Sequence, residues 1–113
     1  MADHTSLRAW QTAQAVARGA YSLANAHWTP AAADSFAQLR RASLSVQLNI
    51  AEGYPWRPRP KWKHHLRIAI GSAMETIDAL HFLLDVGAAP KENLFLLIDE
   101  AERSAVLLRG LLK

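Results

Sequence analysis

Hydrophobic residues recur every three or four positions through most of the chain, as they do in amphipathic helices. Between residues 6 and 27 the repeat is formed by Leu7, Trp10, Ala13, Ala17, Ala20, Tyr21 and Ala24. We expect a first helix there. Thr5 or Ser6 is its expected N-cap, because either hydroxyl can accept a hydrogen bond from an amide of the first turn.

A second helix is predicted from Thr29-Pro30 to Glu52. Threonine is a good N-cap, and proline at the first helical position loses no helical hydrogen bond. The apolar stripe is Phe36, Leu39, Ser43, Val46 and Ile50, and Leu44, Leu48 and Ala51 widen it. Gly53 is the expected stop, since glycine commonly ends helices.

The segment from Tyr54 to Pro60 reads YPWRPRP. Three prolines so close together remove backbone donors and favour extended conformations, so we expect a stiff, exposed loop that is not helical. Pro60 can open a third helix that runs to about Val86 and is closed by Gly87. Its apolar face is Leu66, Ala69, Ile70, Ala73, Ile77, Leu80 and Leu84.

A fourth helix is expected after Pro90, with Leu94, Leu97, Ile98, Ala101, Ala105, Leu108 and Leu112 at helical spacing. No strand-like alternation occurs in the sequence. Short connections between long helices make neighbours antiparallel. The sequence therefore predicts an all-α, up-and-down antiparallel four-helix bundle, with residues 1–113 forming one domain.

The amino-acid composition excludes several kinds of site and a membrane span. The chain has no cysteine, which excludes disulfides, thiolate metal sites and a cysteine nucleophile. No apolar run approaches the roughly 20 residues that a membrane span needs, and Asp3 stands where a secretory signal would carry positive charge. We expect a cytoplasmic protein that does not enter a membrane.

Positive charge is concentrated in one part of the sequence. Residues 40–67 contain seven arginines and lysines and one acid, Glu52, a net charge of +6, whereas the rest of the chain carries −3. The cations are Arg40, Arg41, Arg57, Arg59, Lys61, Lys63 and Arg67. Such clustering is typical of a surface that binds a polyanion.

Two blocks of sequence resemble a known family. They are QLRRASLSVQLNIAEG from Gln38 to Gly53 and HLRIAIGSAME from His65 to Glu75, accompanied by the early pair Trp10-Gln11. Together they resemble the four-helix-bundle proteins encoded in intervening sequences of bacterial large-subunit ribosomal RNA genes. The accessory variability determinant of diversity-generating retroelements is a relative.

The resemblance implies a helical bundle without known catalysis that assembles into a homopentameric ring. In the retroelement branch it also implies binding of nucleic acid and of a reverse transcriptase through a basic surface. After Gly53 this sequence departs from the family pattern, because the tryptophan- and proline-rich loop replaces a simpler Gly-Arg turn. The departure puts in doubt any partner that binds through that loop.

Polar residues form a second pattern within the predicted helices. Arg41, Ser45, Asn49 and Glu52 share one side of the second helix, and Ser72 and Glu75 share one side of the third. The two glutamates could be acid/base groups or metal ligands. We favour a hydrogen-bonded polar seam between the helices, formed by Arg41, Asn49, Glu52, Ser72 and Glu75, in which Arg41 pairs with a carboxylate, because a half-buried charge needs a partner.

Catalytic and metal motifs are missing from the sequence. A di-metal bundle site would need Glu-x-x-His, and the chain offers Glu75-x-x-Asp78 instead. Ser43, Ser45 and Ser72 lie within regular helix and lack the strained turn that exposes a nucleophile. Gly71-Ser72-Ala73 is interpreted as a place of close helix approach. We expect no catalytic residue, no metal and no cofactor.

The basic loop offers the clearest binding chemistry. Its candidate nucleic-acid residues are Arg40, Arg57, Arg59, Lys61, Lys63 and Arg67 for phosphates, with Trp56 for stacking on bases, and Trp62 and His64 are further candidates for stacking. Alternatively, the loop is solvated and its tryptophans pack on the bundle or on a neighbouring subunit.

The functional hypothesis is a non-enzymatic oligomeric adaptor that binds RNA, DNA or a nucleic-acid enzyme. The alternative is a structural or protein-interaction module with no nucleic-acid role. Leu44, Leu48, Trp56 and Trp62 exceed what one bundle core needs, and such a surplus indicates a subunit interface. We therefore expect an oligomer.

Overall fold

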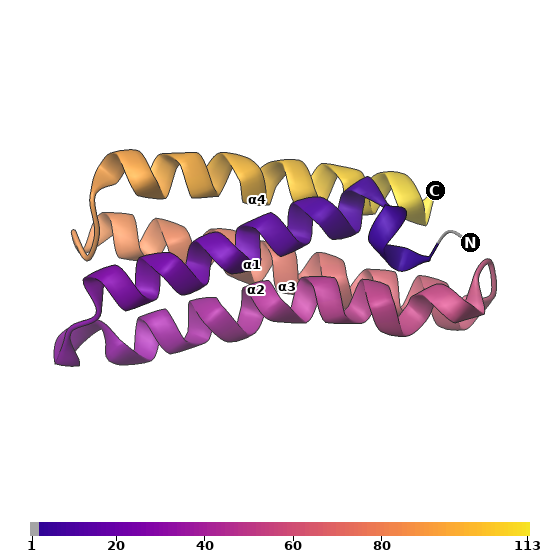
Figure 1. Ribbon diagram of the computed structural model, residues 1–113, viewed down its shortest axis with the longest axis horizontal. Helices are drawn as coiled ribbons and strands as arrows, with labels where there is room; N and C mark the ends of the chain where they lie inside the picture. The colour runs from indigo at the N-terminus through magenta and orange to yellow at the C-terminus, as the bar shows by residue number, and fades with distance from the viewer. Residues whose placement is uncertain (1–2) are drawn as a thin grey trace.

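The computed structural model describes residues 3–113 and consists of four long helices (Figure 1). They are α1 (Arg8–His27), α2 (Ala33–Gly53), α3 (Pro60–Asp85) and α4 (Lys91–Leu112). The chain also forms three short 3-10 helices. η1 (His4–Ser6) precedes α1, η2 (Pro30–Ala32) precedes α2, and η3 (Tyr54–Trp56) follows α2. No strand occurs in this part of the chain, so the predicted all-α class is confirmed.

The helices lie side by side along the long axis of a molecule that measures 43 × 22 × 21 Å. Each packs on two neighbours, in the circular order α1, α2, α3, α4 and back to α1. The α2–α3 connection lies at the same end of the bundle as both termini, and the α1–α2 and α3–α4 connections lie at the other end (Figure 1). This is the up-and-down arrangement that the short connections predict.

The start of α1 differs from the prediction. Thr5 and Ser6 belong to η1, and the N-cap of α1 is Leu7, which offers no side-chain cap. Asp3 caps η1 instead, because its carboxylate accepts hydrogen bonds from the hydroxyl and the backbone amide of Thr5. These two bonds lower the pKa of Asp3 below its usual value. Periodicity alone did not reveal the extra turn.

The predicted start of α2 and end of α3 agree better with the structure. Thr29 Oγ1 accepts from the Ala32 amide at 3.2 Å, as expected, although the first turn after it is the 3-10 turn η2. Gly87 adopts a positive φ of 69°, which glycine allows without strain, and the chain turns there from α3 towards α4.

Gly53 ends α2 for a different reason from the one predicted. Its φ of −80° is ordinary helical backbone. A Cβ at this position would lie 2.7 Å from His65 Cβ and 2.9 Å from Trp62 Cε3. Glycine is therefore required at position 53 because α3 approaches closely.

The close helix contact predicted at Gly71-Ser72-Ala73 is found only in part. Ser72 and Ala73 face the bundle, but a Cβ on Gly71 would meet nothing within 4 Å.

The core consists of two apolar clusters, one towards each end of the bundle. The first includes Phe36, Leu80 and Leu94, and the second includes Ile50 and Leu66. The second cluster also contains Trp62, which is only 6% exposed. Trp62 therefore belongs to the core of this chain, so its assignment to a surplus of surface tryptophans was wrong.

Candidate functional site

Charge is segregated along the axis of the bundle. The end that holds the α2–α3 connection carries eight arginines and lysines and two acids, whereas the rest of the bundle carries five arginines and lysines and eight acids. The eight cations are Arg8, Arg57, Arg59, Lys61, Lys63, Arg67, Arg109 and Lys113. We call these eight residues the basic end. Its net side-chain charge is +6, because only Asp3 and Glu52 oppose it.

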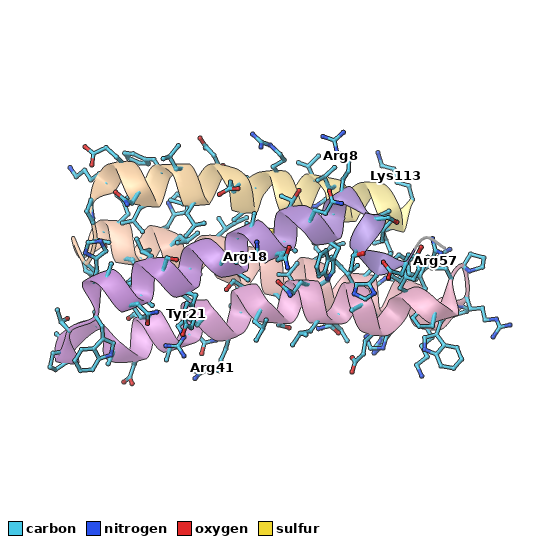
Figure 2. The ribbon with its side chains drawn as sticks, in the orientation of Figure 1. Arg8, Arg18, Tyr21, Arg41, Arg57 and Lys113 are labelled. Carbon is cyan, nitrogen blue, oxygen red and sulfur yellow. The ribbon has the colours of Figure 1, made fainter. Side chains whose placement is uncertain are left out.

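The fold adds cations that the sequence window does not contain. Arg8 begins α1, whereas Arg109 and Lys113 come from the end of α4. The Arg109 side chain reaches back along the bundle, with Nη2 3.3 Å from Met74 Sδ, so only its backbone lies at this end. An even number of antiparallel helices returns both termini to the end occupied by the central connection. Arg8, Arg57 and Lys113 all lie at that end in Figure 2. The antiparallel topology was the available signal, but sequence reasoning used only neighbours along the chain and missed these three.

Arg40 does not belong to the basic end. It precedes Gly53 by thirteen helical residues, about 20 Å at the helical rise of ~1.5 Å per residue. Its guanidinium carbon lies 5.5 Å from the centre of the Tyr21 ring, on the outer side of α1 and α2. The single surface predicted for residues 40–67 is therefore divided into two separate regions.

The loop is ordered by its own aromatic residues. The Arg57 guanidinium carbon lies 3.5 Å from the centre of the Tyr54 ring, and Arg57 Nε donates to the Tyr54 carbonyl at 3.3 Å. Tyr54 meets Trp62 and His4 edge to face, each with ring centres 6.2 Å apart. The prediction of an entirely non-helical loop was wrong, since Tyr54–Trp56 forms a 3-10 turn held against the bundle.

Only part of the predicted stacking surface is accessible. Trp56 is 39% exposed, and Lys61 Nζ lies 4.2 Å from the centre of its ring, so Lys61 covers one face. Trp62 is buried and cannot stack on a base, which corrects that expectation. His64 is exposed. Across residues 3–113, none of the eight cations of the basic end lies within ion-pair distance of a carboxylate.

The inner part of the polar seam links α2 to α3 through half-buried side chains. Ser45 Oγ and Ser72 Oγ are 2.8 Å apart, and Asn49 Nδ2 donates to the Ser45 carbonyl at 2.9 Å. His65 Nδ1 donates to Asn49 Oδ1 at 3.0 Å. His65 was missed as a member, although it lies seven residues, or two helical turns, before Ser72 on the same face of α3.

The charged members lie at the exposed margins of the seam. Arg41 donates to Gln38 Oε1 at 2.8 Å, and Gln38 Nε2 donates to Glu75 Oε2. Arg41 thus reaches Glu75 only through Gln38, which sequence reasoning omitted. Glu75 is exposed, so the expectation that it is half-buried was wrong. Glu52 is 73% exposed at the opposite margin, with Oε2 3.6 Å from His65 Nδ1.

These positions do not form a paired-carboxylate site. Glu52 lies beside His65, which precedes Glu75 by ten residues of α3, about 15 Å along the helix at ~1.5 Å per residue. Within the described residues no three histidine, aspartate or glutamate side chains gather where they could hold a metal ion. Ser43 Oγ donates to the Arg40 carbonyl at 3.2 Å, as a helical serine commonly does.

None of the described helices is long and apolar enough to cross a membrane. The family model described as 23S rRNA-intervening sequence protein matches residues 5–110. No curated protein matches the chain.

Proposed function

The chain belongs to the 23S rRNA-intervening sequence protein family, and we propose that it is a non-enzymatic, cytoplasmic bundle protein that binds nucleic acid through its basic end. The family inferred from the blocks at Gln38–Gly53 and His65–Glu75 is thus confirmed by a match over nearly the whole chain. The binding of RNA or DNA is our inference from the surface.

One observation carries the proposal, namely the collection of eight cations and two acids at one end of the bundle. Cations without carboxylate partners can neutralise phosphates and release condensed counterions, which is the main source of sequence-independent affinity for nucleic acid. The exposed part of Trp56 can add stacking to a base. The same surface would also suit a nucleic-acid enzyme such as a reverse transcriptase, as the family resemblance implies.

Salt-dependent binding of a labelled single-stranded RNA tests the proposal. The double variant Arg57→Ala/Arg59→Ala should bind more weakly and flatten the dependence of log affinity on log salt by up to about 1.4, since each lost phosphate contact contributes about 0.7 on a single strand. Helical content, measured by circular dichroism, should not change, because both side chains are exposed.

The matched control removes two charges from the opposite half of the bundle. Arg40→Ala/Arg41→Ala changes net charge equally but leaves the basic end intact, so its salt dependence should stay close to that of the unmodified protein. Equal loss in both double variants would indicate a general charge effect. Undetectable binding of the unmodified protein at low salt would favour the alternative, a structural or protein-interaction module.

We further propose that the subunits assemble into a homopentameric ring, as the family resemblance implies. Apolar side chains on the outside of the bundle support an interface: Leu44 is 45% exposed, Leu48 52%, Phe82 52% and Phe95 52%. Phe82 and Phe95 border a groove of about 910 Å³ between α3 and α4. Exposed apolar residues on two different faces suit the head-to-tail contacts from which closed rings are built.

A further inference from the structure

A layer of hydroxyl groups crosses the middle of the core. Ser43 on α2, Thr76 on α3 and Ser104 on α4 are the buried polar residues of the described part of the chain, and each is at most 2% exposed. They line one small cavity whose other walls are Ala13, Val16, Val46, Ala73 and Ala101. The layer lies between the two apolar clusters, so these hydroxyls are far from solvent.

Hydrogen bonding leaves the three hydroxyls in different states. Ser43 Oγ donates to the Arg40 carbonyl at 3.2 Å, and Thr76 Oγ1 donates to the Ser72 carbonyl at 2.8 Å. Each of these two has therefore used its hydrogen and keeps oxygen lone pairs. Among residues 3–113, Ser104 Oγ has neither a hydrogen-bond donor nor an acceptor. A buried hydroxyl without a partner costs free energy, which a bound polar molecule would recover.

We propose that this cavity binds one structural water molecule. The water accepts a hydrogen bond from Ser104 Oγ and donates its two hydrogens to Ser43 Oγ and Thr76 Oγ1, the two groups that can still accept. All three hydroxyls are then satisfied. Three hydrogen bonds are also the usual number for a water buried in a protein.

The size of the cavity selects the ligand. The centre of a water-sized sphere has about 10 Å³ of free space there. One water needs roughly 10–15 Å³ by this measure, so the cavity suits one water and excludes a second water or an organic molecule. The bound water would connect α2, α3 and α4 at the same level and would thereby favour this register of the three helices over slipped alternatives.

Oxygen-17 relaxation dispersion of the solvent tests the proposal, since it detects long-lived internal water and is unaffected by proton exchange of hydroxyl groups. Ser104→Val replaces the hydroxyl and adds about the volume that the water would occupy. The dispersion amplitude should fall by the equivalent of one water relative to the unmodified protein. Ser22→Val makes the same chemical change at an exposed position of α1 and should leave the amplitude unchanged.

A second variant keeps the test decisive if Ser104→Val fails to fold. Thr76→Val preserves shape but removes one acceptor, so the water should exchange faster and its contribution should move to higher frequency or disappear. An amplitude in the unmodified protein that equals that of both core variants would overturn the proposal. So would the lack of any internal-water dispersion in the unmodified protein.

Discussion

Gly53 illustrates how packing, and not backbone conformation, can require glycine. Its φ lies in the helical region, where any residue is permitted. The obstacle is the first side-chain atom, which would meet Cβ of His65 and the ring of Trp62. Neither neighbour is the far end of a flexible chain, since Trp62 is buried in the core and His65 is fixed by Asn49. The sequence located this glycine correctly at the end of a helix but could not reveal its neighbours.

Gly53→Ala should therefore destabilise the protein. Inserting one carbon into a packed contact costs about 1–3 kcal/mol, which in a domain of this size lowers the melting temperature by several degrees. Thermal unfolding followed by circular dichroism measures the change. Gly110→Ala is the control, because a Cβ there meets nothing within 4 Å. If both variants melt at the same temperature, the close approach of α3 to Gly53 does not destabilise a residue with a Cβ at this position.

The polar seam between α2 and α3 contains two kinds of residue. Some are half-buried and hydrogen-bonded between the helices, and others lie exposed at its margins. Asn49 is half-buried and joins Ser45 to His65, whereas Glu75 is exposed and contacts Gln38 at the margin. Helical spacing placed Asn49 and Glu75 each on the polar side of its helix. It could not tell how far each lies from solvent, because that depends on the angle at which two helices pack.

The two positions should respond differently to alanine. Asn49→Ala removes hydrogen bonds in a half-buried place and should cost about 1–2 kcal/mol of unfolding free energy. Glu75→Ala removes an exposed charge and should cost less than about 1 kcal/mol. Urea titration of both variants measures the difference. A larger loss for Glu75→Ala would mean that its carboxylate stabilises the bundle more than its exposure suggests.

The helices themselves were predictable because each has its own apolar repeat and its own stop, such as the prolines of the loop or Gly87. The short 3-10 turns η1 and η3 were not, since three residues are too few to show a period. The loop also illustrates this limit. Its prolines correctly predict a break between α2 and α3. The stacking of Arg57 on Tyr54 depends on the path of the folded loop, which the prolines do not reveal.

In the whole molecule, the antiparallel topology determines which charged residues share one end of the bundle. Along the sequence, Arg40 belongs to the basic window and Arg8 does not, whereas in the folded bundle the reverse is true. Residues that share an end come from the start of α1, both sides of the central connection and the end of α4. A set of candidate residues defined by sequence neighbours alone therefore included Arg40, which lies away from the basic end, and omitted three cations that belong to it.

Gly71 is a feature of the single subunit that the proposed ring would explain. Glycine inside a helix costs about 1 kcal/mol relative to alanine, and no atom of the described chain lies close enough to Gly71 to require it. Ile68 and Met74, one turn to either side, are 40% and 45% exposed. A glycine between exposed apolar residues would be explained if a helix of a second copy packs against it. We therefore place Gly71 in the subunit interface of the proposed ring.

Gly71→Ala should then act in opposite directions on folding and on assembly. The added methyl stabilises α3 by up to about 1 kcal/mol but obstructs the second subunit. Light scattering at micromolar concentration should give the unmodified protein a mass about five times the 12.5 kDa of one chain, and a smaller mass for Gly71→Ala. Gly110→Ala, which adds the same methyl to an exposed helical glycine near the end of α4, is the comparison variant and should keep the assembled mass. A mass near 12.5 kDa for the unmodified protein would contradict the ring, and an unchanged mass for Gly71→Ala would move the interface to another face.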